Sequence, residues 1–310
     1  MDGLSHSSVS GTATWCQRTL KAPIGCVGVG LHSGRRVSLT LRPAAEDHGI
    51  VFRRTDLGRD IPARFDQVVD THLATVLADR RWASARVGTV EHLMAALSAL
   101  EIDNALIELD GPEVPALDGS AAPFVFLLDC AGVVEQAASR ATIEIRRPIR
   151  VTEGDAFAEL RPGAPGQRGL EMALSIDFAA AAIGRQALSL TLTPDSFRSE
   201  LARARTFTLV EEVRQLRAAG LAQGGSLENA VVVDQARVLN PAGLRMPDEF
   251  ARHKLLDAVG DLALAGARLQ GRFVAHRSGH ALNNRLLRTL FADASAWREL
   301  SAAPLAVAAA

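Results

Sequence analysis

One stretch of the chain, DEFARHKLLDAVGDLALAG at 248–266, combines groups that could do chemistry together. Its apolar spacing predicts a helix, and at about 100° per residue one side of that helix gathers His253, Lys254, Asp257 and Asp261. His253 and Asp257 are four residues apart, a spacing at which side chains on adjacent turns can share one cation. Taken alone, the stretch favours a simpler interpretation, a solvated polar face that carries a His–Asp pair.

Two shorter motifs contain residues suited to catalysis beside a metal. Glu91 and His92 open the helical pattern TVEHLMAALSAL at 89–100. Adjacent helical side chains point about 100° apart, so Glu91 could reach water beside a cation that His92 holds. His280, in SGHALNN, lies where a strand gives way to a helix, and side chains at element ends are exposed. Taken alone, Glu91 is typical of an ordinary helix N-terminus, and His280 of a capping or turn histidine.

The elements that must position these residues form two similar series. The first has predicted strands at 37–43, 49–57 and 104–111, and predicted helices at 89–100 and 120–133. The second has two strands around a turn within 141–166, strands at 229–235 and 271–279, and helices at 210–221, 248–266 and 283–293. Strands and then helices, given twice, predict an α+β fold of two domains with a similar plan, divided near residue 140. The predicted boundaries are a flexible tail at 1–15, domains at 16–139 and 140–300, and an apolar tail at 301–310.

The composition excludes several classes of protein. The 310 residues include 34 Lys+Arg against 35 Asp+Glu, and this balance argues against a general nucleic-acid binder. Three cysteines without C-x-x-C spacing fit a reducing compartment, and no apolar run approaches the roughly 18 residues of a membrane span. We therefore expect a soluble, cytoplasmic protein. The chain has no tyrosine, so acid–base chemistry falls to histidines, carboxylates or a metal.

Common nucleotide and hydrolase motifs are missing from the sequence. GVGLHSG at 28–34 has the wrong glycine spacing for a dinucleotide loop and precedes a predicted strand rather than a helix. The sequence contains neither a P-loop nor a G-x-S-x-G nucleophile elbow. The metal-type motifs therefore carry the functional argument.

Taken together, these motifs resemble the UDP-3-O-acyl-N-acetylglucosamine deacetylases of lipid A synthesis. The matching strings follow the family order across 17–284: QRTL, GVGLHSG, TVEHLMAAL, IDNALIEL, DGSAAPF, ARTF, GGSLENAVVVD, RHKLLDAVGDL and SGHALNN. The resemblance implies two domains of similar topology, each a sheet packed on helices, with the active site between the facing helical layers. It also implies one Zn²⁺ per chain, held by His92, His253 and Asp257, and leaves open whether Fe²⁺ replaces it in the cell.

The resemblance further implies roles for individual residues. Glu91 matches the family's general base, His280 its general acid, and Asp261 the carboxylate that orients this histidine. Thr206 matches a hydroxyl that helps to polarise the acetyl carbonyl. The other matches are to substrate contacts: Phe207 on the sugar, Lys254 near the diphosphate, Leu31 and His32 along the substrate passage, and Glu212, a weaker match, on the nucleotide.

The implied activity is zinc-dependent hydrolysis of the N-acetyl group of UDP-3-O-acyl-N-acetylglucosamine, an early committed step of lipid A biosynthesis that releases acetate. Two alternatives stay open: a zinc amidase that acts on another N-acetyl sugar, and a non-catalytic binder of nucleotide sugars or lipids. The implied partner is a nucleotide-sugar lipid; a monomer is expected, and a transient contact with a membrane surface stays open. The segment 176–184 is less polar than the family pattern, so no acyl-chain preference is implied, and His72 receives no role.

Overall fold

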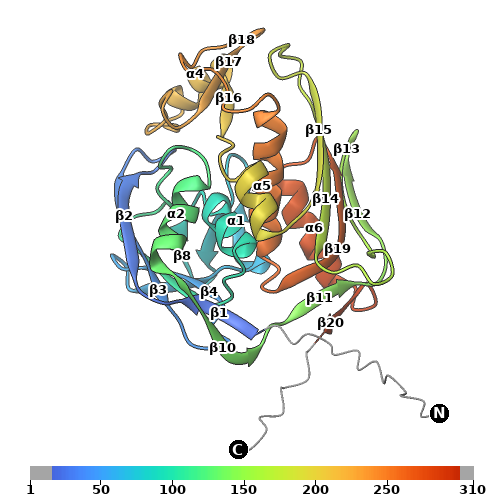
Figure 1. The fold of residues 1–310 in the computed structure, drawn as a ribbon. Helices are drawn as coiled ribbons and strands as arrows, with labels where there is room; N and C mark the ends of the chain where they lie inside the picture. Colours follow the sequence, from blue (N-terminus) through green and yellow to red (C-terminus); the bar gives the residue numbers. More distant parts are fainter. Residues whose placement is uncertain (1–15, 301–310) are drawn as a thin grey trace, which may run out of the picture.

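The computed structural model describes residues 16–300 of the chain (Figure 1). The tails predicted at 1–15 and 301–310 lie outside these residues. The described part is a mixture of sheets and helices, which confirms the predicted α+β class.

The first half of the chain builds one five-stranded sheet and two smaller ones. The five-stranded sheet has the order β2-β3-β9-β4-β5, and within it only β4 and β9 pair in parallel. The smaller sheets are β6-β7-β8 and the antiparallel pair β1-β10. The strands are β1 Cys16–Leu20, β2 Ile24–Val29, β3 Arg36–Pro43, β4 Ile50–Arg54, β5 Arg59–Pro62, β6 Val68–Asp70, β7 Val76–Asp79, β8 Trp82–Val87, β9 Ala105–Leu109 and β10 Val133–Ser139. The helices are α1 Glu91–Ala99 and α2 Ala122–Ala131, with a 3-10 turn at Phe65–Gln67.

The second half builds a seven-stranded sheet and a small three-stranded one. The large sheet has the order β12-β13-β19-β11-β20, and β14 joins it through β19 while also pairing with β15. The small sheet is β16-β17-β18. The strands are β11 Thr142–Ile145, β12 Ile149–Glu153, β13 Ala156–Arg161, β14 Leu170–Asp177, β15 Arg185–Thr191, β16 Phe207–Leu209, β17 Val231–Asp234, β18 Arg237–Val238, β19 Arg268–His276 and β20 Trp297–Leu300. The helices are α3 Pro194–Ser196, α4 Val210–Ala218, α5 Glu249–Ala263 and α6 His280–Ala292, with a π-helical turn at Phe197–Leu201.

The main helices lie between the two large sheets. Figure 1 shows α1 and α2 beside the sheet that contains β2 and β3, and α5 and α6 beside the sheet that contains β14 and β19. Helix α1 packs against α5, which also packs against α6 and β14. Leu93 and Leu97 of α1 and Leu255 and Leu256 of α5 are fully buried in this core. The predicted packing of sheets on helices is thus confirmed.

The strand pairings respect the predicted division of the chain. Every ladder within 16–300 joins strands on the same side of residue 140. The closest strands on either side of it are β10 and β11, which do not pair with each other. The exact domain boundaries, 16–139 and 140–300, stay a prediction.

Most predicted elements are present with small shifts of their ends. The helices predicted at 89–100, 120–133, 210–221 and 248–266 are α1, α2, α4 and α5. The helix predicted at 283–293 begins three residues earlier, because the chain turns from extended backbone at Gly279 (φ −152°) directly into α6 at His280. The interpretation of His280 as a turn residue is therefore wrong. Segment 141–166 contains the predicted hairpin, β12 and β13, but also a third strand, β11, which pairs with β19 and β20.

Candidate metal centre and catalytic site

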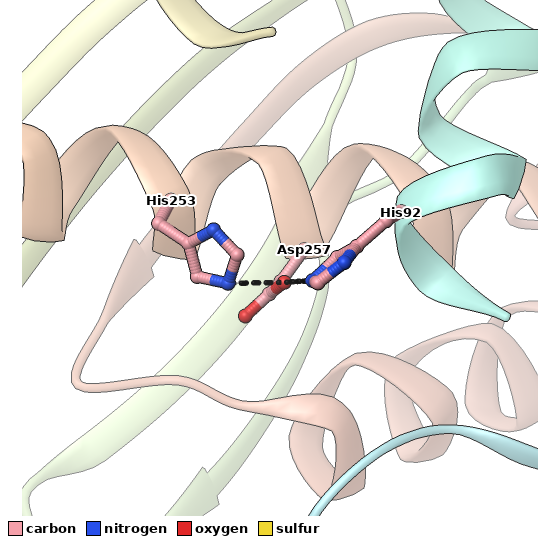
Figure 2. Close-up of side chains that lie close together, drawn as sticks. All are labelled: His92, His253 and Asp257. Atoms are coloured by element: carbon pink, nitrogen blue, oxygen red, sulfur yellow. Dashed lines mark ion pairs between the residues drawn. The ribbon is translucent and has the colours of Figure 1, made fainter. Parts of the chain in front are cut away.

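Three potential metal ligands converge where α1 meets α5 (Figure 2). His92 is the second residue of α1, and His253 and Asp257 lie one turn apart on α5. One ligand atom from each residue lies within 4.8 Å of the other two. Asp257 Oδ1 is 3.5 Å from His92 Nε2 and 3.3 Å from His253 Nε2, the two ion pairs dashed in Figure 2. The three atoms therefore lie close enough together to contact one ion, and the point between them is called the centre below.

The protonation of His253 and Asp257 suits a divalent cation. His253 Nδ1 donates to the carbonyl of Ala204 at 3.0 Å, which leaves the lone pair of Nε2 facing the centre. Burial lowers the pKa of His253 to about 4, so its ring is neutral at physiological pH. Burial alone would raise the pKa of Asp257, but nearby His253 and Lys254 hold it well below its usual range.

An oxygen atom without a hydrogen-bond donor is the strongest indication that these residues bind a cation. Asp257 Oδ1 is buried and accepts no hydrogen bond among the described residues. A buried carboxylate oxygen without a donor is costly unless a cation or a water meets it. Two imidazole nitrogens and one carboxylate oxygen are a ligand set typical of zinc. The residues present therefore fit a metal ion.

Glu91, the first residue of α1, lies beside this centre. Its side chain is buried, and its Oε2 accepts the backbone N–H of Thr75 at 3.0 Å. Its other oxygen, Oε1, is 3.8 Å from His280 Nε2. Burial raises the pKa of Glu91, although the neighbouring His280 and His92 oppose the shift. The result is a carboxylate of increased basicity that is held in a fixed direction.

Opposite Glu91 stands a histidine paired with a carboxylate. Nδ1 of His280, the first residue of α6, hydrogen-bonds Asp261 Oδ2 at 2.9 Å. Burial on its own would lower the pKa of His280, but the charges of Asp261 and Glu91 outweigh it and raise the pKa to about 9. His280 is therefore a cation at neutral pH, with Nε2–H directed towards the centre, 3.8 Å from Glu91 and 4.0 Å from Asp257.

A glycine on α5 allows the two helices to bring these groups together. A β-carbon at Gly260 would lie 2.0 Å from the carbonyl oxygen of Glu91, far inside van der Waals contact. The backbone of α5 thus touches α1 at the residue where α1 begins. This close approach sets the separation between Glu91 and the residues of α5.

The polar side of α5 is enclosed rather than solvated. His253, Asp257 and Asp261 are each at most 3% exposed. The simpler interpretation of the sequence, a solvated face, is therefore wrong, because α1 and α6 cover this side of the helix. Lys254 is partly exposed, and its Nζ donates to Asp257 Oδ2 at 2.9 Å.

A cavity of about 630 Å³ lies next to the centre. Its lining includes all five of the other residues predicted to touch substrate or carbonyl, namely Leu31, His32, Thr206, Phe207 and Glu212. The ring of Phe207 lies 6.2 Å from that of His253, edge on, so this phenylalanine joins the cavity to the triad. His72, which received no role from the sequence, also lines the cavity.

Comparison with known proteins agrees with this geometry. Residues 17–292 match the family model described as UDP-3-O-acyl N-acetylglycosamine deacetylase. The UDP-3-O-acyl-N-acetylglucosamine deacetylase of Idiomarina loihiensis is 48% identical over 94% of this chain and 96% of its own length. That of Myxococcus xanthus is 50% identical, over 92% of this chain and 89% of its own length. This chain belongs to the same family. The resemblance inferred from the motifs is confirmed.

Two of the matched residues make contacts in this family member that the motifs did not indicate. Glu212 Oε2 accepts the N–H of Leu209 and the hydroxyl of Thr208, both at 3.1 Å, and so caps α4. Lys254 is engaged with Asp257, a potential metal ligand, rather than pointing away from it. The predicted roles of both residues towards the nucleotide stay predictions.

The segment 176–184, which is less polar than the family pattern, packs beside the cavity. Phe178 lies edge on against Phe207, with ring centroids 5.5 Å apart, and Ala180 and Ile183 are buried. The segment also meets the small sheet, because Ala182 N–H donates to the carbonyl of Gln235. Phe178 therefore contributes to the apolar packing around Phe207.

The sequence did not indicate two residues that hold Asp261, the partner of His280, in place. The Thr75 hydroxyl donates to Asp261 Oδ1 at 2.6 Å, and Asn283 Nδ2 donates to Asp261 Oδ2 at 2.9 Å. Asn283 lies one turn after His280 in SGHALNN, so helical spacing could have indicated it. Thr75 is 186 positions from Asp261, and no local pattern connects them.

None of the helices within 16–300 has the length and apolar character needed to cross a membrane. The three cysteines, Cys16, Cys26 and Cys130, are all free thiols.

Proposed function

We propose that this chain hydrolyses the N-acetyl group of UDP-3-O-acyl-N-acetylglucosamine and releases acetate, an early committed step of lipid A biosynthesis. The observation that carries the proposal is the buried, unpartnered Oδ1 of Asp257, which faces two histidine nitrogens between Glu91 and His280. A chain that only binds a nucleotide sugar has no need for a buried acid and base on either side of a metal-type ligand set. The membership of the deacetylase family selects the substrate class.

The metal that we infer is one Zn²⁺ per chain, held by His92, His253 and Asp257. When bound, such an ion supplies a Lewis acid that polarises a carbonyl group and makes water more acidic. The hydrogen bond from His253 to Ala204 and the ammonium of Lys254 on Asp257 fix the directions of two of the ligands. Fe²⁺ in the cell stays an open alternative, because imidazole and carboxylate also suit iron.

Glu91 is placed to act as the general base. As water attacks the acetyl carbon and the new C–O bond forms, Glu91 takes the proton that the water loses. Its raised pKa makes it a better proton acceptor, and the Thr75 N–H holds Oε2 so that Oε1 faces His280 and the centre. The Thr206 hydroxyl is proposed to donate to the oxygen on which negative charge develops.

His280 is placed to act as the general acid. The C–N bond breaks as Nε2–H of His280 transfers its proton to the departing amine nitrogen, which leaves as an amine. Asp261 holds the opposite ring nitrogen, so the ring presents Nε2–H to the centre and keeps its charge near neutral pH. At the end of the reaction Glu91 carries one extra proton and His280 lacks one. Proton exchange with water returns both residues to their starting states.

The cavity beside the triad is proposed to receive the substrate. Phe207 would pack on the sugar, Leu31 and His32 would line the passage, and Glu212 would face the nucleotide. Lys254 is the one lysine on α5 and is proposed to meet the diphosphate with the exposed part of its side chain. We infer a cytoplasmic location, because three free thiols suit a reducing compartment, and we propose that the chain acts as a monomer.

Acetate release tests the proposal directly. Purified protein is incubated with UDP-3-O-acyl-N-acetylglucosamine, with and without a chelator, and then with Zn²⁺ or Fe²⁺ restored. We expect acetate release that the chelator abolishes and the metal restores. Acetate from other N-acetyl sugars but not from this substrate would favour the second amidase hypothesis. Tight binding of the substrate without any acetate would favour a non-catalytic binder.

A further inference from the structure

Thr75 contacts both Glu91 and Asp261, although it lies outside the sequence motifs that contain these two residues. It lies just before β7, and it is buried, with 1% of its surface exposed. Its backbone N–H donates to Glu91 Oε2 at 3.0 Å, and its hydroxyl donates to Asp261 Oδ1 at 2.6 Å. Its carbonyl accepts the N–H of Val90, the residue before α1. All three polar groups of one residue therefore serve the site.

The hydroxyl completes the set of donors around Asp261. Oδ2 of this carboxylate accepts from His280 and Asn283, and Oδ1 accepts from Thr75. With both oxygens held, the carboxylate plane cannot rotate about its last bond without losing a buried hydrogen bond. The orientation of Asp261 in turn fixes the ring of His280, because the Nδ1 contact is the hydrogen bond that positions this ring.

We propose that Thr75 is a positioning residue for this reaction. It fixes the position of the Asp261 carboxylate on α5 relative to that of Glu91 on α1. The backbone N–H orients the base and the hydroxyl orients the partner of the acid, so one residue fixes the distance between the two proton-transfer groups. The inference rests on the proposed function, since it assigns Glu91 and His280 to proton transfer. Thr75 itself does not contact reacting atoms.

Thr75→Val tests the hydroxyl alone, because valine keeps the branched shape and the backbone N–H. We expect kcat to fall by about 10-fold to 100-fold, with KM and metal content close to wild type. Thr75→Ser, which keeps the donor, should restore most of kcat. If the Thr75→Val protein does not fold, Thr75→Ala replaces it. Alanine also removes the hydroxyl, is smaller than valine, and should show the same loss of kcat.

Thr19→Val is the matched control. Thr19 is a buried threonine of β1 whose hydroxyl donates to the carbonyl of Asn104 and accepts the N–H of Ala44. Its loss should lower the midpoint of thermal unfolding without changing kcat. A role of Thr75 that is merely structural predicts the same result for Thr75→Val.

The outcomes separate this inference from the proposed function. If wild-type protein releases no acetate, the proposed function fails, whatever the variants do. If wild-type protein is active and Thr75→Val keeps its kcat, the positioning role is overturned while the function stands. The same holds if Thr75→Ser is as impaired as Thr75→Val, or if the loss of kcat follows a matching loss of metal.

Discussion

Gly260 offers a sharp test of the idea that the α1–α5 contact sets the catalytic geometry. In the interior of a helix, Gly→Ala usually stabilises by about 1 kcal/mol, because alanine has the higher helix propensity. Here the added methyl would stand 2.0 Å from the carbonyl oxygen and 2.7 Å from the carbonyl carbon of Glu91. These atoms are backbone and cannot rotate away. The helices must therefore separate by roughly 1 Å, and overpacking of this kind costs about 1–3 kcal/mol.

The shift falls on Glu91 and should reduce catalysis more than stability. A displacement of about 1 Å at reacting groups can cost about 100-fold in rate. We expect Gly260→Ala to lower kcat to this extent, while the thermal unfolding midpoint falls by only a few degrees because the gain in helix propensity offsets part of the strain. Gly163→Ala, in the loop after β13, is the control, since the three atoms nearest to its β-carbon all belong to the flexible side chain of Gln167 and none is backbone. A Gly260→Ala protein with normal kcat and raised stability would refute the reasoning.

Four further predictions concern individual ionisable residues of the site and the core. Glu91→Gln keeps the acceptor for the Thr75 N–H, so kcat should fall by about 10²-fold to 10⁴-fold while metal analysis gives wild-type content. The pH profile of kcat should be bell-shaped. Its acid limb should lie above the usual carboxylate range, because burial raises the pKa of Glu91, and its basic limb should lie near pH 9, the pKa of His280. A flat profile would count against paired proton transfer. Lys254→Arg should raise KM if the ammonium meets the diphosphate, and an unchanged KM with weakened metal binding would assign Lys254 to the support of its carboxylate partner instead. Glu249→Gln should cost about 3–5 kcal/mol of unfolding free energy in denaturant titrations, because the carboxylate of Glu249 is fully buried and pairs with buried Arg205 at 2.8 Å; unchanged stability would contradict this.

The sequence contains enough local information to predict the helices that carry the site. The apolar spacing of 248–266 and the glycine at its end correspond to a helix that begins at Glu249 and ends at Ala263. Alternation in 37–43 likewise corresponds to β3, whose residues are buried in turn. Strands such as β1 and β10 were not predicted, because their pairing partners are more than 100 positions apart and neither alternates clearly. Their existence depends on tertiary contacts rather than on local pattern.

The same limit applies within the site. Spacing on α5 correctly grouped His253, Asp257 and Asp261, but it could not show whether that side faces water or protein. That depends on α1, more than 150 positions away, and on Gly260, which permits the contact. The sequence also could not show which anion the Lys254 ammonium contacts, because the carboxylate of a metal ligand and the phosphate of a substrate both attract an ammonium group.

The charges buried at the α1–α5 contact explain why these groups are placed together. Glu91, Asp257 and Asp261 are three buried carboxylates, and they face two cations, Lys254 and His280. Counted by themselves, these three ionised carboxylates and two cations give a net charge of −1, and a divalent ion at Asp257 Oδ1 would reverse it to +1. A positive, water-poor site favours the negative charge that develops on the acetyl oxygen during amide hydrolysis. The excess carboxylate is therefore a requirement for holding the metal, and the cations on either side keep the cost of burying it low.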